Sequence, residues 1–160
     1  MNARIPASVL NTADVLAHTA AAWDEDITQR IGDYIQIPCK SPGFDAQWQA
    51  HGHIQIALQQ AADWVRAQKV PGLTLELISL TDAQGQPRTP VLFFEVPAHL
   101  HDSRQTVLMY GHLDKQPEFN GWRNDLGPWT PKLETGADGA TRLYGRGGAD
   151  DGYAAYASIA

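Results

Sequence analysis

The chain has 160 residues, of which 43% are hydrophobic, and its formal net charge is −6. This length and composition allow one sizeable hydrophobic core and argue against an intrinsically disordered chain. The acidic balance, with no basic stripe along the sequence, argues against a surface that binds nucleic-acid phosphates. No stretch approaches the roughly 20 apolar residues of a membrane span, so a membrane protein is not expected either.

The cellular location is predicted from cysteine usage and from the start of the chain. The single cysteine, Cys39, cannot form an internal disulfide, which suits a reducing compartment. The first residues lack the apolar core of a signal peptide, and the alanine-rich stretch near residues 19–22 is short and soon followed by acidic residues. We therefore expect a soluble, cytoplasmic protein. Cys39 has no sequence neighbour that marks a nucleophile, so a structural role is favoured.

Two helices are predicted in the first half of the chain. Apolar residues recur at helical spacing over residues 12–35, and Pro38 ends that stretch because the residue before a proline avoids the helical region. A second amphipathic helix is predicted over residues 45–68, and the Pro71-Gly72 pair stops it.

Three strands are predicted next, over residues 73–80, 90–96 and 106–110, with a Gly-Gln-Pro turn after the first and a loop over 97–104 after the second. The apolar runs at 91–94 and 107–110 are continuous, as in central strands covered on both faces. The predicted fold class is therefore α/β, with helices packed on both faces of a mixed, mostly parallel sheet. Residues 115–143 form a long connection of the kind that is usually functional, and a last helix resumes at about residue 151.

A histidine and an aspartate follow the third predicted strand, in the sequence Tyr110-Gly-His-Leu-Asp-Lys115. Open α/β sheets bind ligands at such strand ends, and spacing by two puts His112 and Asp114 on one side of an extended backbone. The carboxylate could then accept a hydrogen bond from one imidazole nitrogen and leave the other nitrogen free for a metal ion. A merely solvated His-x-Asp pair is the alternative.

A second acidic pair, Asp150 and Asp151, follows a glycine-rich turn in the sequence Tyr144-Gly-Arg-Gly-Gly-Ala-Asp-Asp-Gly152. Carboxylates at this place can also cap the helix that follows, and we favour that role for Asp151. For Asp150 the small neighbouring residues favour a metal ligand, because they let backbone and ion approach closely. A dinucleotide-binding turn is disfavoured, because Asp150 stands where the third glycine of that motif would be and would repel a pyrophosphate.

The remaining histidines and tryptophans give weaker signals. His51 and His53 lie two apart on the predicted second helix, which would point them to different faces and disfavours a shared metal ion. His99 and His101 lie in a predicted loop. We expect Trp122 and Trp129 to pack the long connection over the sheet edge rather than to line a substrate site.

The ordered combination of these motifs over residues 20–160 resembles the co-catalytic zinc peptidases and deacylases of peptidase family M20, which include carnosinase, carboxypeptidase G, acetylornithine deacetylase and succinyl-diaminopimelate desuccinylase. That family has a strand ending in Gly-His-x-Asp, a loop rich in Trp and Pro, and a Tyr-Gly-Arg-Gly-x-x-Asp turn. The corresponding residues here are Tyr110 to Asp114, then Gly121-Trp122 and Pro128 to Pro131, then Tyr144 to Asp150, and the stretch Ile35 to Pro38 also fits.

The resemblance implies a metal-dependent hydrolase of amide or peptide bonds in small peptides or N-acyl amino acids. His112 would ligate one of two zinc ions, Asp150 would bridge both, and Asp114 would orient His112; Co²⁺ or Mn²⁺ could replace Zn²⁺. It also implies that residues 1–160 are the N-terminal portion of a catalytic domain. The general base, the other ligands and a lid domain that forms a homodimer would lie beyond Ala160, so the isolated chain is expected to be inactive.

Two positions depart from the family pattern and leave the substrate open. Gly152 stands where the family often has a lysine, and Lys115 replaces the common apolar residue after the first aspartate. The rival interpretation, from a different class, is a non-catalytic module that folds or binds partners without turnover.

Overall fold

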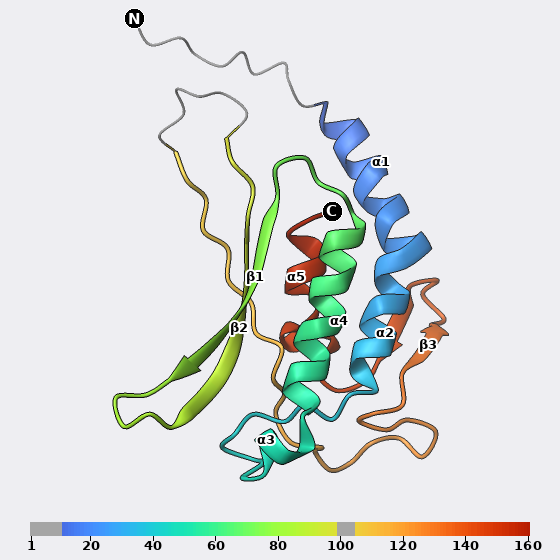
Figure 1. The fold of residues 1–160 in the computed structure, drawn as a ribbon. Coiled ribbons are helices and arrows are strands. Elements are labelled where there is room, and N and C mark those ends of the chain that lie inside the picture. The colour runs from blue at the N-terminus through green and yellow to red at the C-terminus, as the bar shows by residue number, and fades with distance from the viewer. Residues whose placement is uncertain (1–10, 99–104) are drawn as a thin grey trace, which may run out of the picture.

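The helices of the first half of the chain lie side by side in the fold (Figure 1). The computed structural model describes residues 11–98 and 105–160. Helix α1, Thr12–Ala22, continues through a π-helical turn, η1, at Trp23–Ile27 into α2, Thr28–Ile35. The predicted helix over 12–35 is thus confirmed. No side chain is buried within α1; Ala22 and Trp23 pack partly buried against the core, and Ile27 is the first buried residue.

The predicted second helix is broken in two. Helix α3, Trp48–His51, is separated from α4, His53–Ala67, by Gly52, which adopts a left-handed conformation with φ of +69°. Residues 45–47 form a turn rather than the first turn of a helix. The helix expected over 45–68 is therefore confirmed over α3 and α4 but wrong at 45–47 and at Gly52, where a left-handed residue ends the helical hydrogen-bond ladder.

The strands form two separate antiparallel hairpins. Strands β1, Thr74–Thr81, and β2, Pro87–Glu95, pair with each other across a tight turn in which the Asp82 amide donates to the Gln86 carbonyl. Strands β3, Lys132–Thr135, and β4, Thr141–Tyr144, pair within the predicted long connection. The first two predicted strands and the turn between them are confirmed.

The predicted mixed, mostly parallel sheet is wrong. Each described strand pairs antiparallel with its neighbour in the sequence, in two sheets of two strands. Parallel strands need a crossover of a dozen or more residues, usually a helix, between them. Helices α1 to α4 all precede β1, and no described helix lies between β1 and β4. Among the described residues, parallel pairing is confined to one isolated bridge between Lys40 and Lys115.

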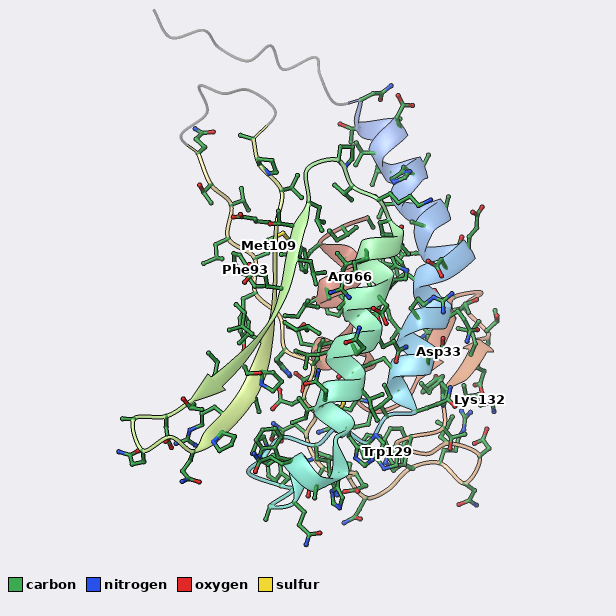
Figure 2. The ribbon with its side chains drawn as sticks, viewed as in Figure 1. Asp33, Arg66, Phe93, Met109, Trp129 and Lys132 are labelled. Atoms are coloured by element: carbon green, nitrogen blue, oxygen red, sulfur yellow. The ribbon has the colours of Figure 1, made fainter. Side chains whose placement is uncertain are left out.

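The predicted third strand, over 106–110, is also wrong. These residues have no strand partner in the described part of the chain, and Val107, Leu108 and Tyr110 are each at least 85% exposed. Figure 2 shows Met109 and Phe93 on the outer side of the β1–β2 hairpin, away from α4. A run of apolar side chains does not make a strand unless another backbone satisfies its hydrogen bonds. Most of the loop expected over 97–104 lies outside the described residues.

The core lies between α2, α4, the β1–β2 hairpin and a short last helix, α5, Ala154–Ala157. Trp64 of α4 meets Tyr156 of α5 edge to face, with ring centroids 4.9 Å apart. Cys39 is fully buried, and its thiol donates to the Leu113 carbonyl at 3.1 Å, which fits the structural role expected of it. Two clusters make up this core: Ile27, Ile31, Ile35, Trp64, Val65 and Tyr156, and Tyr34, Cys39, Ile54, Ala57 and Leu58.

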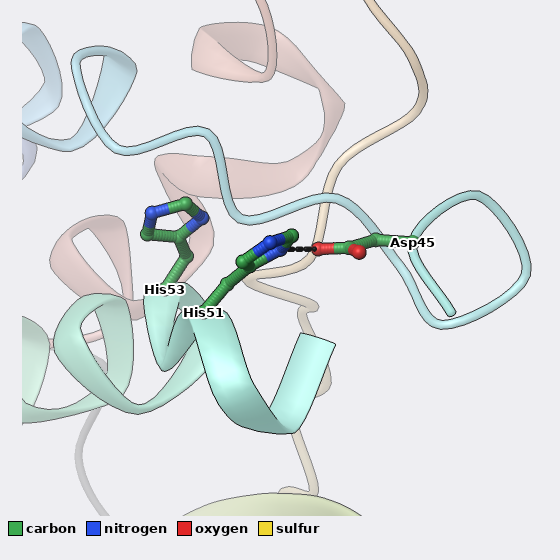
Figure 3. A group of neighbouring side chains, drawn as sticks. All are labelled: Asp45, His51 and His53. Atoms are coloured by element: carbon green, nitrogen blue, oxygen red, sulfur yellow. Dashed lines mark hydrogen bonds and ion pairs between the residues drawn. The ribbon is translucent and has the colours of Figure 1, made fainter. Parts of the chain in front are cut away.

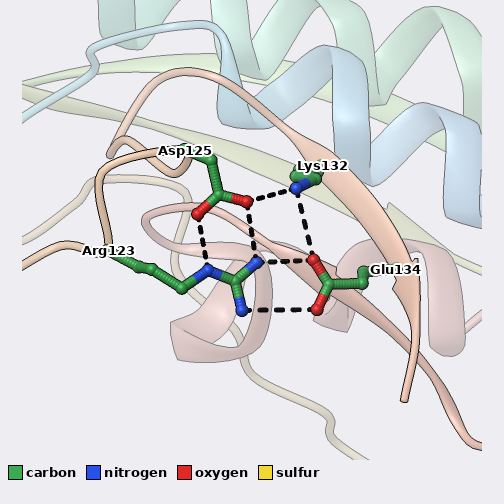
Figure 4. Close-up of polar contacts among 4 residues, drawn as sticks. All are labelled: Arg123, Asp125, Lys132 and Glu134. Atoms are coloured by element: carbon green, nitrogen blue, oxygen red, sulfur yellow. Dashed lines mark hydrogen bonds and ion pairs between the residues drawn. The ribbon is translucent and has the colours of Figure 1, made fainter. Parts of the chain in front are cut away.

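The long connection is held together by polar contacts rather than by a core of its own. Arg123 pairs with both Asp125 and Glu134, and Lys132 bridges the same two carboxylates (Figure 4). The Trp122 indole donates to the Glu118 carbonyl at 2.8 Å, a contact within the connection itself. No helix in the described parts of the chain has the length and apolarity to cross a membrane.

Candidate metal centre

The segment that carries His112 is extended and is fixed to the end of α2. The Tyr34 hydroxyl donates to the Leu113 carbonyl at 3.2 Å, and the Lys115 amide donates to the Cys39 carbonyl at 2.8 Å. These two contacts lie on either side of Asp114 and directly after His112 on the backbone. The strand end expected here is absent, yet the backbone next to His112 is anchored by the hydroxyl of the buried Tyr34.

The two ring nitrogens of His112 face different partners. Nδ1 lies 2.9 Å from the backbone oxygen of Asp114 and 3.2 Å from Oδ1 of the same residue. Both partners are acceptors, so Nδ1 carries the proton. In the neutral ring Nε2 then has the lone pair that a metal ion would need. A metal-binding histidine needs this arrangement, in which an outer acceptor fixes the tautomer and the ring direction.

The second ring nitrogen of His112, Nε2, faces the carboxylate of Asp150. Nε2 lies 3.2 Å from Oδ1 of Asp150, although 38 positions separate the two residues. Two ligands at zinc bond lengths of about 2.0–2.1 Å in a tetrahedral site lie about 3.3 Å apart. The 3.2 Å separation is that of an ordinary ion pair in the protonated ring, and it also matches the spacing of two ligands to one ion. The side chains are 32% and 65% exposed, so the place is open to solvent.

The charge around the His112 ring is negative. Burial lowers the pKa of His112, but the hydrogen bond to the Asp114 carbonyl and the charges of Asp114, Asp150 and Asp151 outweigh it, so the pKa is raised overall. The same carboxylates would attract a dication.

Glycines let the turn of Asp150 approach the His112 segment. A Cβ on Gly111 would stand 2.3 Å from the Ala154 Cβ, and a Cβ on Gly152 would stand 2.1 Å from Cε1 of Tyr34. Gly147 has φ of +82° and packs against the Lys115 side chain. Helix α5 starts only after Asp151, and no side chain caps it, so the capping role favoured for Asp151 is wrong.

His112 and Asp150 are two ligands, and zinc sites in proteins use three or four protein ligands. In residues 11–98 and 105–160, one group of three or more metal-binding side chains comes together, and it is a different one: Asp45, His51 and His53. Any further ligands to an ion at His112 and Asp150 would have to come from other parts of the protein or from a rearrangement of the described side chains.

The group of Asp45, His51 and His53 was missed by sequence reasoning. The expectation that His51 and His53 point to different faces is wrong, because Gly52 breaks the helix between them. Their rings are stacked, with centroids 5.5 Å apart (Figure 3). The glycine between the two histidines was the signal that could have revealed this. His99 and His101 lie outside the described residues.

The chain is similar over part of its length to a known peptide hydrolase. It is 39% identical over 74 residues to the beta-Ala-His dipeptidase of Homo sapiens. The matched stretch is 45% of this chain and 13% of the human protein, so the chain corresponds to a small part of that relative. No protein-family model matches the sequence.

Proposed function

We propose that this chain is part of a metal-dependent hydrolase that cleaves an amide or peptide bond in a small peptide or an N-acyl amino acid. The observation that carries the proposal is the pair of His112 Nε2 and Asp150 Oδ1, 3.2 Å apart, with the other imidazole nitrogen held by Asp114. The partial similarity to a dipeptidase supports the same reaction class.

Each residue of the centre has a separate role in this proposal. His112 would donate its Nε2 lone pair to a zinc ion, and Asp150 would supply a carboxylate, bridging to a second ion where two are bound. Asp114 would keep the proton on Nδ1 and hold the ring direction. The bound metal would supply Lewis acidity toward the scissile carbonyl and toward a water molecule.

The proposal extends to residues that the described centre does not supply. Hydrolysis needs a proton acceptor for the attacking water and further ligands for the metal. We propose that other residues of the protein provide both, and that the protein acts as a homodimer. The open, acidic surroundings of His112 suit a small substrate that reaches the metal from solvent.

The test is metal-dependent turnover by the protein at its natural length. The protein is stripped with a chelator, reloaded with Zn²⁺, Co²⁺ or Mn²⁺, and assayed against a panel of dipeptides and N-acetyl amino acids. We expect turnover that depends on the added metal, is lost in His112→Ala and persists in His18→Ala, which changes an exposed histidine of α1. Turnover that survives both the chelator and His112→Ala would refute the proposal, as would its absence with every metal.

A further inference from the structure

The structure contains a second group of metal-binding side chains, formed by Asp45, His51 and His53, outside the His112 centre. We propose that these three residues bind a transition-metal dication, with Zn²⁺ preferred. One ligand atom from each residue lies within 4.8 Å of the other two. The proposal does not depend on the function proposed above.

The backbone at Gly52 brings the two histidines together. In a continuous helix, residues two apart point roughly 200° away from each other. Here Gly52, with φ of +69° and ψ of +5°, ends α3 directly after His51, and His53 opens α4. The two rings stack with an interplanar angle of 27° (Figure 3). A left-handed residue at this point is inexpensive for glycine and unfavourable for other residues.

The carboxylate of Asp45 is fixed and points at the histidines. Its Oδ1 accepts from the Gln47 amide at 3.0 Å, and its Oδ2 lies 2.7 Å from Nδ1 of His51. The Asp45 amide donates to the Ser41 carbonyl, which anchors the loop from the other side. The side chain of Asp45 is only 9% exposed. A buried carboxylate held in this way is a preorganised ligand, or an outer partner that orients His51.

The imidazole ring of His53 contains an unpaired nitrogen. Nδ1 of His53 is buried and has no hydrogen-bond partner in the described chain. Buried polar atoms in native proteins are nearly always paired, and those that are not often mark the place of an unseen ion or water. An ordinary hydrogen bond between Asp45 and His51, the last residue of α3, explains two members of the group but leaves this atom of His53 unexplained. A metal ion explains all three.

The donor set selects the class of ion. Two imidazoles and one carboxylate suit Zn²⁺ and its neighbours in the first transition row, whereas Ca²⁺ and Mg²⁺ prefer oxygen ligands. Ligands of a tetrahedral zinc ion lie about 3.3 Å apart, so the side chains would close in slightly on binding. The His51 side chain is 44% exposed, so water can reach it as a further ligand.

The experiment removes His112 and Asp150, so that metal binding reports on the group of Asp45, His51 and His53. In a His112→Ala, Asp150→Ala background, Zn²⁺ binding is measured by equilibrium dialysis and Co²⁺ binding by its visible absorption spectrum. His51→Gln, His53→Gln and Asp45→Asn are compared with His18→Gln, and circular dichroism verifies that each variant is folded. Asn at position 45 can still accept from the Gln47 amide, so the turn is kept while the charge is lost.

We expect the background protein to bind about one equivalent of Zn²⁺ and to give a Co²⁺ spectrum with nitrogen ligands. His51→Gln and His53→Gln should weaken binding by more than the about 10–100-fold that loss of an outer partner brings, and His18→Gln should not weaken it. A folded background protein that binds no Zn²⁺, or binding unchanged by His51→Gln, refutes the proposal. If His53→Gln fails to fold, His51→Gln decides, because that side chain is the more exposed of the two.

Discussion

Nε2 of His112 lies 3.2 Å from Oδ1 of Asp150, and Nδ1 of the same ring lies 2.9 Å from the backbone oxygen of Asp114. The ring is thus held at one nitrogen by a local acceptor and faces a carboxylate from a distant turn at the other. This relationship separates the role of a ligand from that of an orienting residue, and mutations can tell the two apart.

Asp114→Asn should be milder than His112→Ala. The substitution keeps the backbone oxygen, which is the nearer partner of Nδ1, and removes only the charge of the carboxylate 3.2 Å away. We expect a loss of metal affinity or turnover near the lower end of the about 10–100-fold range for outer partners. His112→Ala should deplete metal outright. Zinc stoichiometry and turnover of both variants check this, and equal losses in both would contradict it.

Gly111→Ala should disturb both the fold and the metal centre. Its Cβ would stand 2.3 Å from the Ala154 Cβ and 3.2 Å from Oδ2 of Asp151, so the turn of Asp150 would have to move. We expect a loss of about 1–3 kcal/mol in the free energy of unfolding, the usual range for overpacking, together with weaker zinc binding. Gly43→Ala is the matched control, because a Cβ there meets nothing within 4 Å. Equal denaturation midpoints for the two variants would count against the close packing described here.

Lys115→Met should destabilise the end of α2. The ammonium group is buried and donates to the carbonyls of Tyr34, Ile35 and Ile37 at 2.8, 3.2 and 2.7 Å. Burial lowers the pKa of Lys115 to about 8, so the group is still protonated at pH 7. Methionine fills the space but leaves carbonyls without a donor, at about 1–3 kcal/mol.

Lys40→Met is the control for that change. Lys40 pairs with Glu118 at 2.9 Å near the surface, where ion pairs contribute about 0–1 kcal/mol. Urea denaturation at pH 7 should therefore rank Lys115→Met clearly below Lys40→Met in stability. The reverse order would show that the buried ammonium is not a stabilising cap.

Asp26 should make stability depend on pH in the acid range. The Trp64 indole donates to its Oδ2 at 2.6 Å, and this bond, with Arg30, holds the pKa of Asp26 below its ordinary value against the opposing effect of burial. A lowered pKa in the folded state gives stability that is present above the unfolded pKa of about 3.9 and is lost as the pH falls through the folded value.

Asp26→Asn provides the comparison for that titration. At pH 7 we expect the variant to be less stable by about 1 kcal/mol, and the difference should shrink between about pH 4 and pH 2. Thermal melts of both proteins across this range measure it. A difference that stays constant with pH would mean that the Asp26 charge contributes nothing.

Local patterns in the sequence predicted the local structure well. The helical spacing over 12–35 and the Gly85 turn between two β-rich stretches each depend on neighbouring residues, and both are confirmed. The parallel sheet failed because pairing between strands depends on crossovers, which apolar runs do not encode. The run at 107–110 is apolar enough for a central strand, yet it has no strand partner in the described chain and is exposed.

The two candidate sites differ in how far the sequence could reveal them. The glycines around Asp150 and the spacing of His112 and Asp114 pointed to residues that the structure does bring together. His51 and His53 were dismissed on the assumption of a continuous helix, and one left-handed glycine changed the direction of both rings. The contact with Asp45 depends on a loop whose path only the folded chain defines.

The central claim is that His112 and Asp150 hold a catalytic metal ion. Its most direct test measures zinc content and peptide turnover on the same preparations of the unaltered protein and of Asp150→Ala. We predict that the variant loses turnover and binds less zinc, because the proposed role of Asp150 is a carboxylate shared by two ions. Full zinc occupancy with near-normal turnover in Asp150→Ala would contradict the claim.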